Sequence, residues 1–182
     1  GIGKALKTIM HTDPDNLKTY KGSFGAAGLR TEGEVDDGVQ PIWMIPEKAH
    51  RVREHVEEGR RKAGKSTGLA DFDIAPFVRV RMGDDLEACR NEVKAEMGFY
   101  IGGMGARDKN FYNDYAKRLG YEDAAKKIQD AFLDGRRKEA AALVPDELVD
   151  LTSLVGPSDR IKARVQAWKA AAADNSVGSL LM

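Results

Sequence analysis

The segment GSFGAAGLR, residues 22–30, has the residue types that a phosphate-binding loop needs. Glycine lets backbone N–H groups approach an anion closely and adopts dihedral angles that other residues avoid. A helix beginning at Leu29 would add about half a positive charge at its amino end, and Arg30 would add a full one. The segment matches neither G-x-G-x-x-G nor the P-loop pattern. A plain turn is the commoner explanation of such a composition, so both interpretations stay open.

Other segments with chemical potential give weaker signals. GGMG at residues 102–105 fits a hinge between helices, or a mobile lid near a ligand. GKST at 64–67 follows a helical pattern instead of preceding one, which argues against a P-loop. His50 and His55 are five residues apart, so they do not share a helix face as a metal pair would. We find no nucleophile–base arrangement and no cluster with the spacing of a metal site.

The composition sets limits on fold and partners. The chain has 182 residues, 29 basic and 29 acidic, with a net charge of +0 and a mean hydropathy of −0.48. We expect one domain over 1–182 with a poorly defined segment at 1–21. Balanced charge argues against nucleic acid or an acidic membrane as partner, and no apolar run could cross a bilayer. Cys89 alone cannot form an internal disulfide, which fits a reducing compartment such as the cytoplasm.

Strands and helices alternate in the predicted order. Apolar periodicity predicts strands at 39–45, 73–85 and 177–182. It predicts helices at 29–38 (ended by Gly38), 46–64, 84–97, several within 108–143, one in 144–157 followed by a turn, and 158–172 with Ser158 as N-cap. Strands separated by helices pair in parallel, so the pattern is typical of an α/β fold.

The side-chain pattern also predicts which residues are buried. In residues 73–85, Ile74, Val78, Val80 and Met82 recur at even spacing, which places them on one face of a strand opposite Arg79. We expect Trp43 and Trp168 to lie in the core, together with the aromatic pairs Phe99/Tyr100 and Tyr112/Tyr115.

Five blocks of the sequence together resemble a known family. They are FGAAGLRTEGEVDDG, WMIPEKAHRVREHVEEGRRKAG, DFDIAPFVRVRMGDD, GFYIGGMGARDKNFYNDYAKRLGY and VPDELVDLTSLVGPSDRIKARVQAW. In this order they resemble luciferase-like monooxygenases, above all the branch of oxidoreductases that depend on the deazaflavin coenzyme F-420. The resemblance covers roughly residues 22–182.

The resemblance implies a partial TIM-type (β/α)8 barrel. It places strands five to eight at LKTYKGSF, VQPIWMI, IAPFVRVR and SLLM, with a long helical insertion after strand seven. A complete barrel takes about 200–250 residues or more. The chain then corresponds to the second half, and the residues expected to carry catalysis lie in the first.

The resemblance also assigns a cofactor site. The cofactor is coenzyme F-420, with FMN as the alternative, and its phosphate end lies at the loop after strand five. Carried over by position, that loop comprises Ser23, Phe24, Gly25, Ala26, Ala27, Gly28, Leu29 and Arg30. GGMG falls where the family shapes its substrate pocket. The chain departs from the family pattern at two places. Residues 18–21 in strand five are polar, and Ala26 stands where the family often has proline.

Two functions follow as expectations. The first is hydride transfer between a reduced deazaflavin or flavin and a small organic substrate, in which the protein binds and orients and the cofactor supplies the chemistry. The barrel would then be completed by a second copy or by a complementing chain. The second is a truncated, non-catalytic paralogue that acts as a helical dimerisation or scaffold module.

Overall fold

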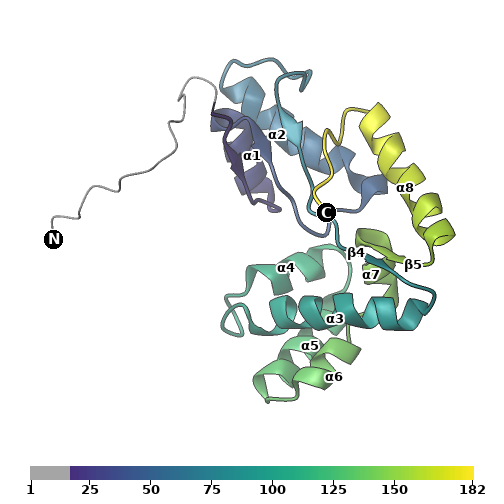
Figure 1. Cartoon of the computed structure of the whole chain (residues 1–182). Coiled ribbons are helices and arrows are strands. Elements are labelled where there is room, and N and C mark those ends of the chain that lie inside the picture. Colours follow the sequence, from purple (N-terminus) through teal and green to yellow (C-terminus); the bar gives the residue numbers. More distant parts are fainter. Residues whose placement is uncertain (1–16) are drawn as a thin grey trace, which may run out of the picture.

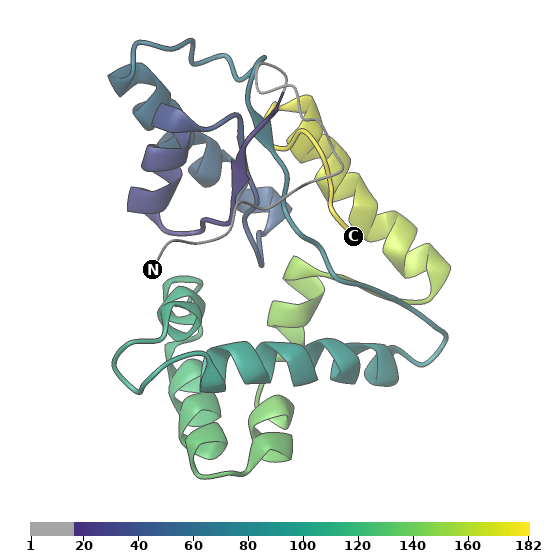
Figure 2. The same cartoon turned by 60° about the vertical axis from the view of Figure 1, so that its left-hand side comes forward.

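Parallel strands with their connecting helices form one part of the molecule, and a group of helices that includes α3 forms the other (Figures 1 and 2). The structure is a computed structural model, and it describes residues 17–182. Residues 1–16, most of the segment expected to be poorly defined, lie outside the described residues. Within residues 17–182, no helix is long and apolar enough to cross a membrane.

The first part is a small parallel sheet covered by helices. Its elements are β1 (Tyr20–Lys21), α1 (Ala26–Val35), β2 (Gly38–Val39), the 3-10 turn η2 (Pro46–Lys48), α2 (His50–Lys62), β3 (Asp73–Ile74) and α8 (Ser158–Ala173). The strand order is β1-β2-β3 and both pairings are parallel. Parallel bridges from Ile42 to Phe77 and from Phe77 to Leu181 continue this sheet toward the C-terminus. The α/β prediction is therefore confirmed.

The second part is the helical insertion. It comprises α3 (Leu86–Gly103), α4 (Phe111–Arg118), α5 (Glu122–Leu133), α6 (Arg137–Ala142) and α7 (Asp146–Thr152). A short parallel pair, β4 (Val80–Met82) with β5 (Leu154–Gly156), links it to the sheet. The two parts have separate cores, one around Val93, Ile101 and Leu148 and the other around Val56, Ile74 and Trp168.

The structure corrects four boundaries. The helix expected at 29–38 is α1, which begins at Ala26, and Gly38 opens β2 instead of ending the helix. Residues 154–156, expected as a turn, form β5 because β4 offers them a partner far away in sequence. Pro157, not Ser158, occupies the N-cap position of α8. The α3 helix continues to Gly103, because Gly102 and Gly103 let it approach the ring of Phe132.

Burial follows the expected pattern in part. Trp43 and Trp168 are buried as expected. Gly64 has φ +71 just after α2, which confirms glycine as the stop signal of that helix. Phe99 is 48% exposed, so its expected core position is wrong, and Met82, at the end of β4, is 73% exposed. Within residues 17–182 the ladder at Met82 holds two strands, which leaves its side chain exposed at the end of a short ladder.

Glycines let α1 and α2 pack with their backbones in close contact. A Cβ on Gly59 would lie 1.9 Å from the Arg30 carbonyl oxygen, and one on Gly33 would lie 2.2 Å from that of Val56. We expect Gly59→Ala to lower the free energy of unfolding by about 1–3 kcal/mol, because backbone atoms cannot move aside as a side chain could. The loss should appear although alanine favours helix by about 1 kcal/mol.

Urea unfolding followed by circular dichroism measures this effect. Glu54→Ala on the exposed face of α2 is the matched control, and we expect it to change stability by no more than about 0.5 kcal/mol. Equal stability of the two variants would show that α1 and α2 do not need this close approach.

Candidate functional site

Aromatic side chains gather where the carboxyl ends of the parallel strands face the helical insertion. Phe24 follows β1 and Trp43 follows β2, while Tyr100, Tyr112 and Tyr115 come from α3 and α4. The Phe24 ring centroid lies 4.8 Å from that of Tyr115, and the Trp43 ring is stacked parallel to Tyr115 at 6.3 Å. Trp43 has φ +47, a left-handed conformation that is unusual for a bulky residue. Such strain is concentrated at functional sites.

A cavity of about 200 Å³ opens beside this cluster. We call it the aromatic cavity. Its lining residues are Ile42, Trp43, Phe77, Arg79, Glu96, Tyr100, Tyr112, Thr152 and Ser153. Burial raises the pKa of Tyr112, so its hydroxyl keeps the proton at neutral pH and can donate a hydrogen bond into the cavity.

Two asparagines fix the position of Tyr112. Asn110 is the N-cap of α4, and its Oδ1 accepts hydrogen bonds from the backbone of Tyr112 and Asn113 at 3.0 and 3.1 Å. The Nδ2 atoms of both asparagines donate to the Ile101 carbonyl at the end of α3. Both side chains are buried, so these bonds lock α4 against α3 and hold Tyr112 at the cavity wall.

The glycine-rich loop leads directly into α1. Gly25 is the N-cap and carries no side chain to cap the helix, and the first turn holds no acidic residue. The first intrahelical bond runs from the Leu29 amide to the Gly25 carbonyl at 2.9 Å. The amides of Ala26, Ala27 and Gly28 therefore have no helical acceptor and stay available to an anion.

A second cavity, of about 190 Å³, lies beside the start of α1, and we call it the basic cavity. Phe24 and Ala26 line it, together with Lys48, Arg51 and Arg118 from η2, α2 and α4. No acidic side chain lines it, so its potential is positive. Tyr115 also lines it, and burial raises the pKa of that phenol to about 12.

The expected cofactor residues take different places around this loop. Ser23 donates a hydrogen bond to Glu32 Oε1 at 2.8 Å, and Gly28 leaves room for it, since a Cβ there would lie 2.8 Å from Ser23 Oγ. Leu29 is buried in the core. Arg30 forms an ion pair with Glu58 on α2, so its charge is already partnered. The remaining four, Phe24 to Ala27, form the loop and first turn beside the basic cavity.

Glu32 supports the loop from beneath and is almost completely buried, at 1% exposure. Its Oε2 and the Oδ2 of Asp36 are both buried, and within residues 17–182 no third group donates a hydrogen bond to either atom. Burial raises the pKa of Glu32 above its ordinary 4.5, and the hydrogen bond from Glu32 lowers the pKa of Asp36. A proton held on Glu32 and shared with Asp36 satisfies both carboxylates.

This arrangement predicts a pH dependence of stability. Since the pKa of Glu32 is raised in the folded state, the stability that its proton contributes is present at low pH and is lost as the pH rises through the raised value. We expect Glu32→Gln, whose amide keeps a donor at every pH, to flatten the loss of stability that begins as the pH rises above the ordinary carboxyl pKa of 4.5. Urea midpoints over this range measure it. Glu34→Gln on the same helix is the control, and an equally steep loss in both variants would contradict the shared proton.

The family model for luciferase-like monooxygenases matches residues 4–175. The chain belongs to the luciferase-like monooxygenase family. It is 34% identical over 171 residues to a Mycobacterium tuberculosis protein named as a coenzyme F420-dependent oxidoreductase, covering 94% of this chain and 49% of the relative. It is 26% identical to the 5,10-methylenetetrahydromethanopterin reductase of Archaeoglobus fulgidus, covering 84% of this chain and 45% of the relative. The chain thus spans about half the length of these relatives.

Solved structures agree on the fold. The coenzyme F420-dependent tetrahydromethanopterin reductase of Methanopyrus kandleri superposes with a TM-score of 0.71 at 22% identity, over 92% of this chain and 45% of that chain. An F420-dependent secondary alcohol dehydrogenase, in complex with an F420-acetone adduct, superposes with a TM-score of 0.64 at 14% identity, over 92% of this chain and 43% of that chain. At these identities the likeness establishes the α/β fold.

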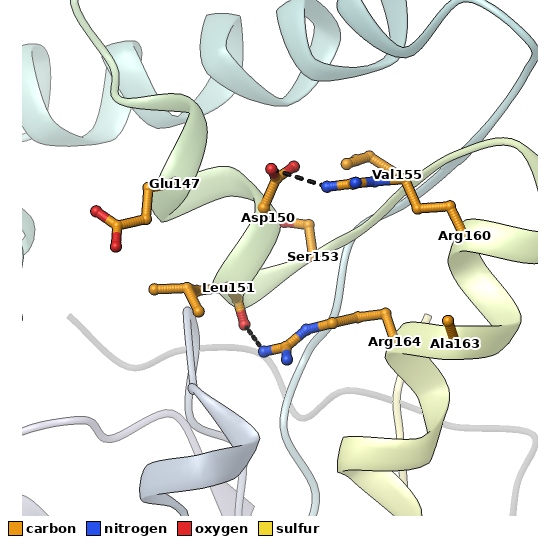
Figure 3. A pocket seen from close by; sticks show the side chains of 8 residues that line it. All are labelled: Glu147, Asp150, Leu151, Ser153, Val155, Arg160, Ala163 and Arg164. Atoms are coloured by element: carbon orange, nitrogen blue, oxygen red, sulfur yellow. Dashed lines mark hydrogen bonds and ion pairs between the residues drawn. The ribbon is translucent and has the colours of Figure 1, made fainter.

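In this luciferase-like chain a further cavity lies beside the α7–β5 junction. It measures about 500 Å³ between α7, β5 and α8. Figure 3 shows Asp150 facing Arg160, and Arg164 donating to the Leu151 carbonyl. Arg164 also pairs with Glu47 on η2. Because these charges satisfy one another, a charged ligand would have to displace ion pairs, and the polar groups here fasten the insertion to α8.

The sequence predicted a cofactor role for the loop, but it gave no sign of the charges around the loop. Lys48, Arg51 and Arg118 are far apart in the chain, and each looks like an ordinary exposed helix residue. The expected GGMG contribution to the substrate pocket is not among the residues that line the aromatic cavity. His50 is exposed and His55 lies 3.6 Å from Glu58. Across residues 17–182, no group of His, Cys, Asp and Glu side chains is placed to hold a metal ion.

Proposed function

We propose that this chain forms part of an oxidoreductase that transfers a hydride between coenzyme F420 and a small organic substrate. One observation carries the proposal: the ring of Phe24, which lines the basic cavity, lies 5.5 Å from the ring of Tyr112, which lines the aromatic cavity, so the two cavities are neighbours beyond the carboxyl ends of β1 and β2. Ligands of α/β proteins bind at that side. Relatives named for coenzyme F420 support the choice of cofactor, and FMN is the alternative.

The residues present fit a cofactor with a flat ring and an anionic end. The free amides of Ala26, Ala27 and Gly28 would hold a phosphate, and Lys48, Arg51 and Arg118 would add positive charge around it. The rings of Phe24 and Tyr115, which line the basic cavity, offer apolar surface to a conjugated ring.

When bound, the reduced cofactor supplies a hydride to a carbonyl or alkene carbon, and the neighbouring atom of the substrate takes up a proton from solvent. The chain's own contribution is binding and orientation. The protonated Tyr112 hydroxyl at the aromatic cavity can donate a hydrogen bond to a substrate oxygen and fix its place.

We further infer that this chain forms one half of a barrel. The strands β1, β2 and β3 and the bridge at Leu181 would be strands five to eight of a (β/α)8 barrel, within one domain over 1–182. The edge strand β1 has exposed side chains and an open ladder. A second copy or a complementing chain would cover such an edge.

Titration with coenzyme F420 and, separately, with FMN tests the proposal, with cofactor fluorescence as the readout. We expect F420 to bind and FMN to bind more weakly. Absence of binding by both at high micromolar concentration would refute a cofactor role for this chain.

A scaffold role is the second candidate, favoured by the exposed apolar side chains Phe99, Met104 and Phe111 on the helical insertion. Light scattering after size exclusion separates the two, together with the titration. A stable dimer that binds neither cofactor supports the scaffold, whereas F420 binding supports the oxidoreductase.

A further inference from the structure

Arg79 places a cation in the wall of the aromatic cavity, where four of the other eight lining residues are aromatic. It shares the cavity lining with Phe77, Trp43, Tyr100 and Tyr112. Its guanidinium carbon lies 4.5 Å from the Phe77 ring centroid, so a cation–π contact orients the guanidinium. Backbone hydrogen bonding fixes the residue itself, because the Arg79 carbonyl accepts from the Leu154 amide at 2.8 Å.

The guanidinium has donors to spare. It carries five N–H groups, and within residues 17–182 its side chain makes one hydrogen bond, from Nη2 to Glu96. Nε is buried and has no acceptor. A buried donor without an acceptor is unfavourable, so a ligand that satisfies it gains more than an ordinary surface contact would.

Glu96 is a weak competitor for these donors. The side chains of Arg79 and Glu96 are 33% and 30% exposed, and partly exposed ion pairs contribute little to stability. A ligand carboxylate can therefore displace Glu96 toward solvent and take its place. The planar guanidinium matches a carboxylate with two parallel hydrogen bonds, which a single Glu96 contact does not use.

The size of the cavity limits how large the rest of a carboxylate ligand can be. Pockets for drug-sized molecules measure about 300–1,000 Å³, and this one measures about 200 Å³. Aromatic walls favour a flat apolar body. The lining thus fits one ring with one acidic group.

We propose that the aromatic cavity binds a small aromatic carboxylate, with the carboxylate on Arg79 and the ring among Trp43, Tyr100 and Tyr112. That this ligand class is the hydride acceptor rests on the proposed function, whereas the binding itself does not. In that case the charge of Arg79, and not the cofactor loop, determines which class of substrate binds.

Benzoate and its neutral analogue benzamide are the probes, and tryptophan emission of the chain is the readout, because Trp43 lies in the cavity wall. We expect benzoate to bind at least about tenfold more tightly than benzamide, the value of a charge-assisted hydrogen bond. Arg79→Gln should abolish this preference while benzamide binding persists. Glu96→Gln removes the carboxylate that competes for Arg79, so this variant should bind benzoate about two- to fivefold more tightly.

Equal affinities for benzoate and benzamide, or benzoate binding weakened by Glu96→Gln, would overturn the proposal. Should Arg79→Gln fail to fold by circular dichroism, the sign of the Glu96→Gln effect decides alone. A parallel titration with coenzyme F420 keeps the two claims apart. Benzoate binding when neither F420 nor FMN binds leaves the carboxylate site standing and refutes the proposed function, and cofactor binding without a preference for benzoate does the reverse.

Discussion

Replacing Ala27 by Asp is expected to weaken the binding of coenzyme F420 by about 30-fold, which corresponds to about 2 kcal/mol of like-charge repulsion. Ala27 is exposed in the first turn of α1, where the proposed phosphate would meet the free amides. A carboxylate at this position competes for the same positive end of the helix. Fluorescence titration of the wild type and the variant measures the difference.

The design of this variant separates binding from folding. An acidic residue in the first turn stabilises a helix by about 0.3–1 kcal/mol, so Ala27→Asp should unfold at the same or a higher temperature than the wild type. Ala27→Asn has the same shape without the charge and is the control, with an expected loss of less than about threefold. If all three proteins bind F420 alike, the phosphate does not lie at the start of α1.

The parallel α/β pattern could be predicted because its signals are local. Gly64 ends α2 with φ +71, and apolar residues such as Ile74 and Val78 are buried as their strand spacing predicts. The strand β5 could not, since its three residues form a strand only because β4 lies beside them, some seventy positions earlier. Short ladders of this kind depend on tertiary contacts, and their sequences fit a turn equally well.

The candidate site also has one part that the sequence could predict and one part that it could not. Loop 23–28 was predicted because glycines and a following helix are adjacent in sequence, and the family resemblance gave the loop a role. The Arg79–Glu96 pair and the basic residues around Arg118 could not be predicted, since charged side chains on different helices give no joint signal until the helices pack. Burial decides the rest: Tyr112 and Tyr115 look alike in sequence, yet only Tyr115 is almost completely buried.

Replacing Trp43 by Ala is expected to lower the free energy of unfolding by about 3–5 kcal/mol, because the truncation leaves a cavity among packed aromatic rings. Trp43 is 8% exposed and contacts Tyr100, Tyr112 and Tyr115 with ring centroids 5.8 to 6.4 Å away. Circular dichroism in urea measures the loss without relying on tryptophan emission. Trp43→Phe keeps a ring in place and should lose less than half as much. A loss below about 1 kcal/mol for Ala would contradict a packed cluster.

The backbone at Trp43 makes a sharper comparison possible. With φ +47, any side chain at this position pays a steric cost of roughly 1–2 kcal/mol that glycine does not pay. We therefore expect Trp43→Gly to be more stable than Trp43→Ala, the reverse of the usual order of these two substitutions. That order would mean that the fold holds the backbone strained in order to place an aromatic ring between the two cavities. The usual order, with the Ala variant more stable, would mean that the backbone at position 43 relaxes once the ring is removed. The packing of the tryptophan ring would then be the cause of the strained backbone.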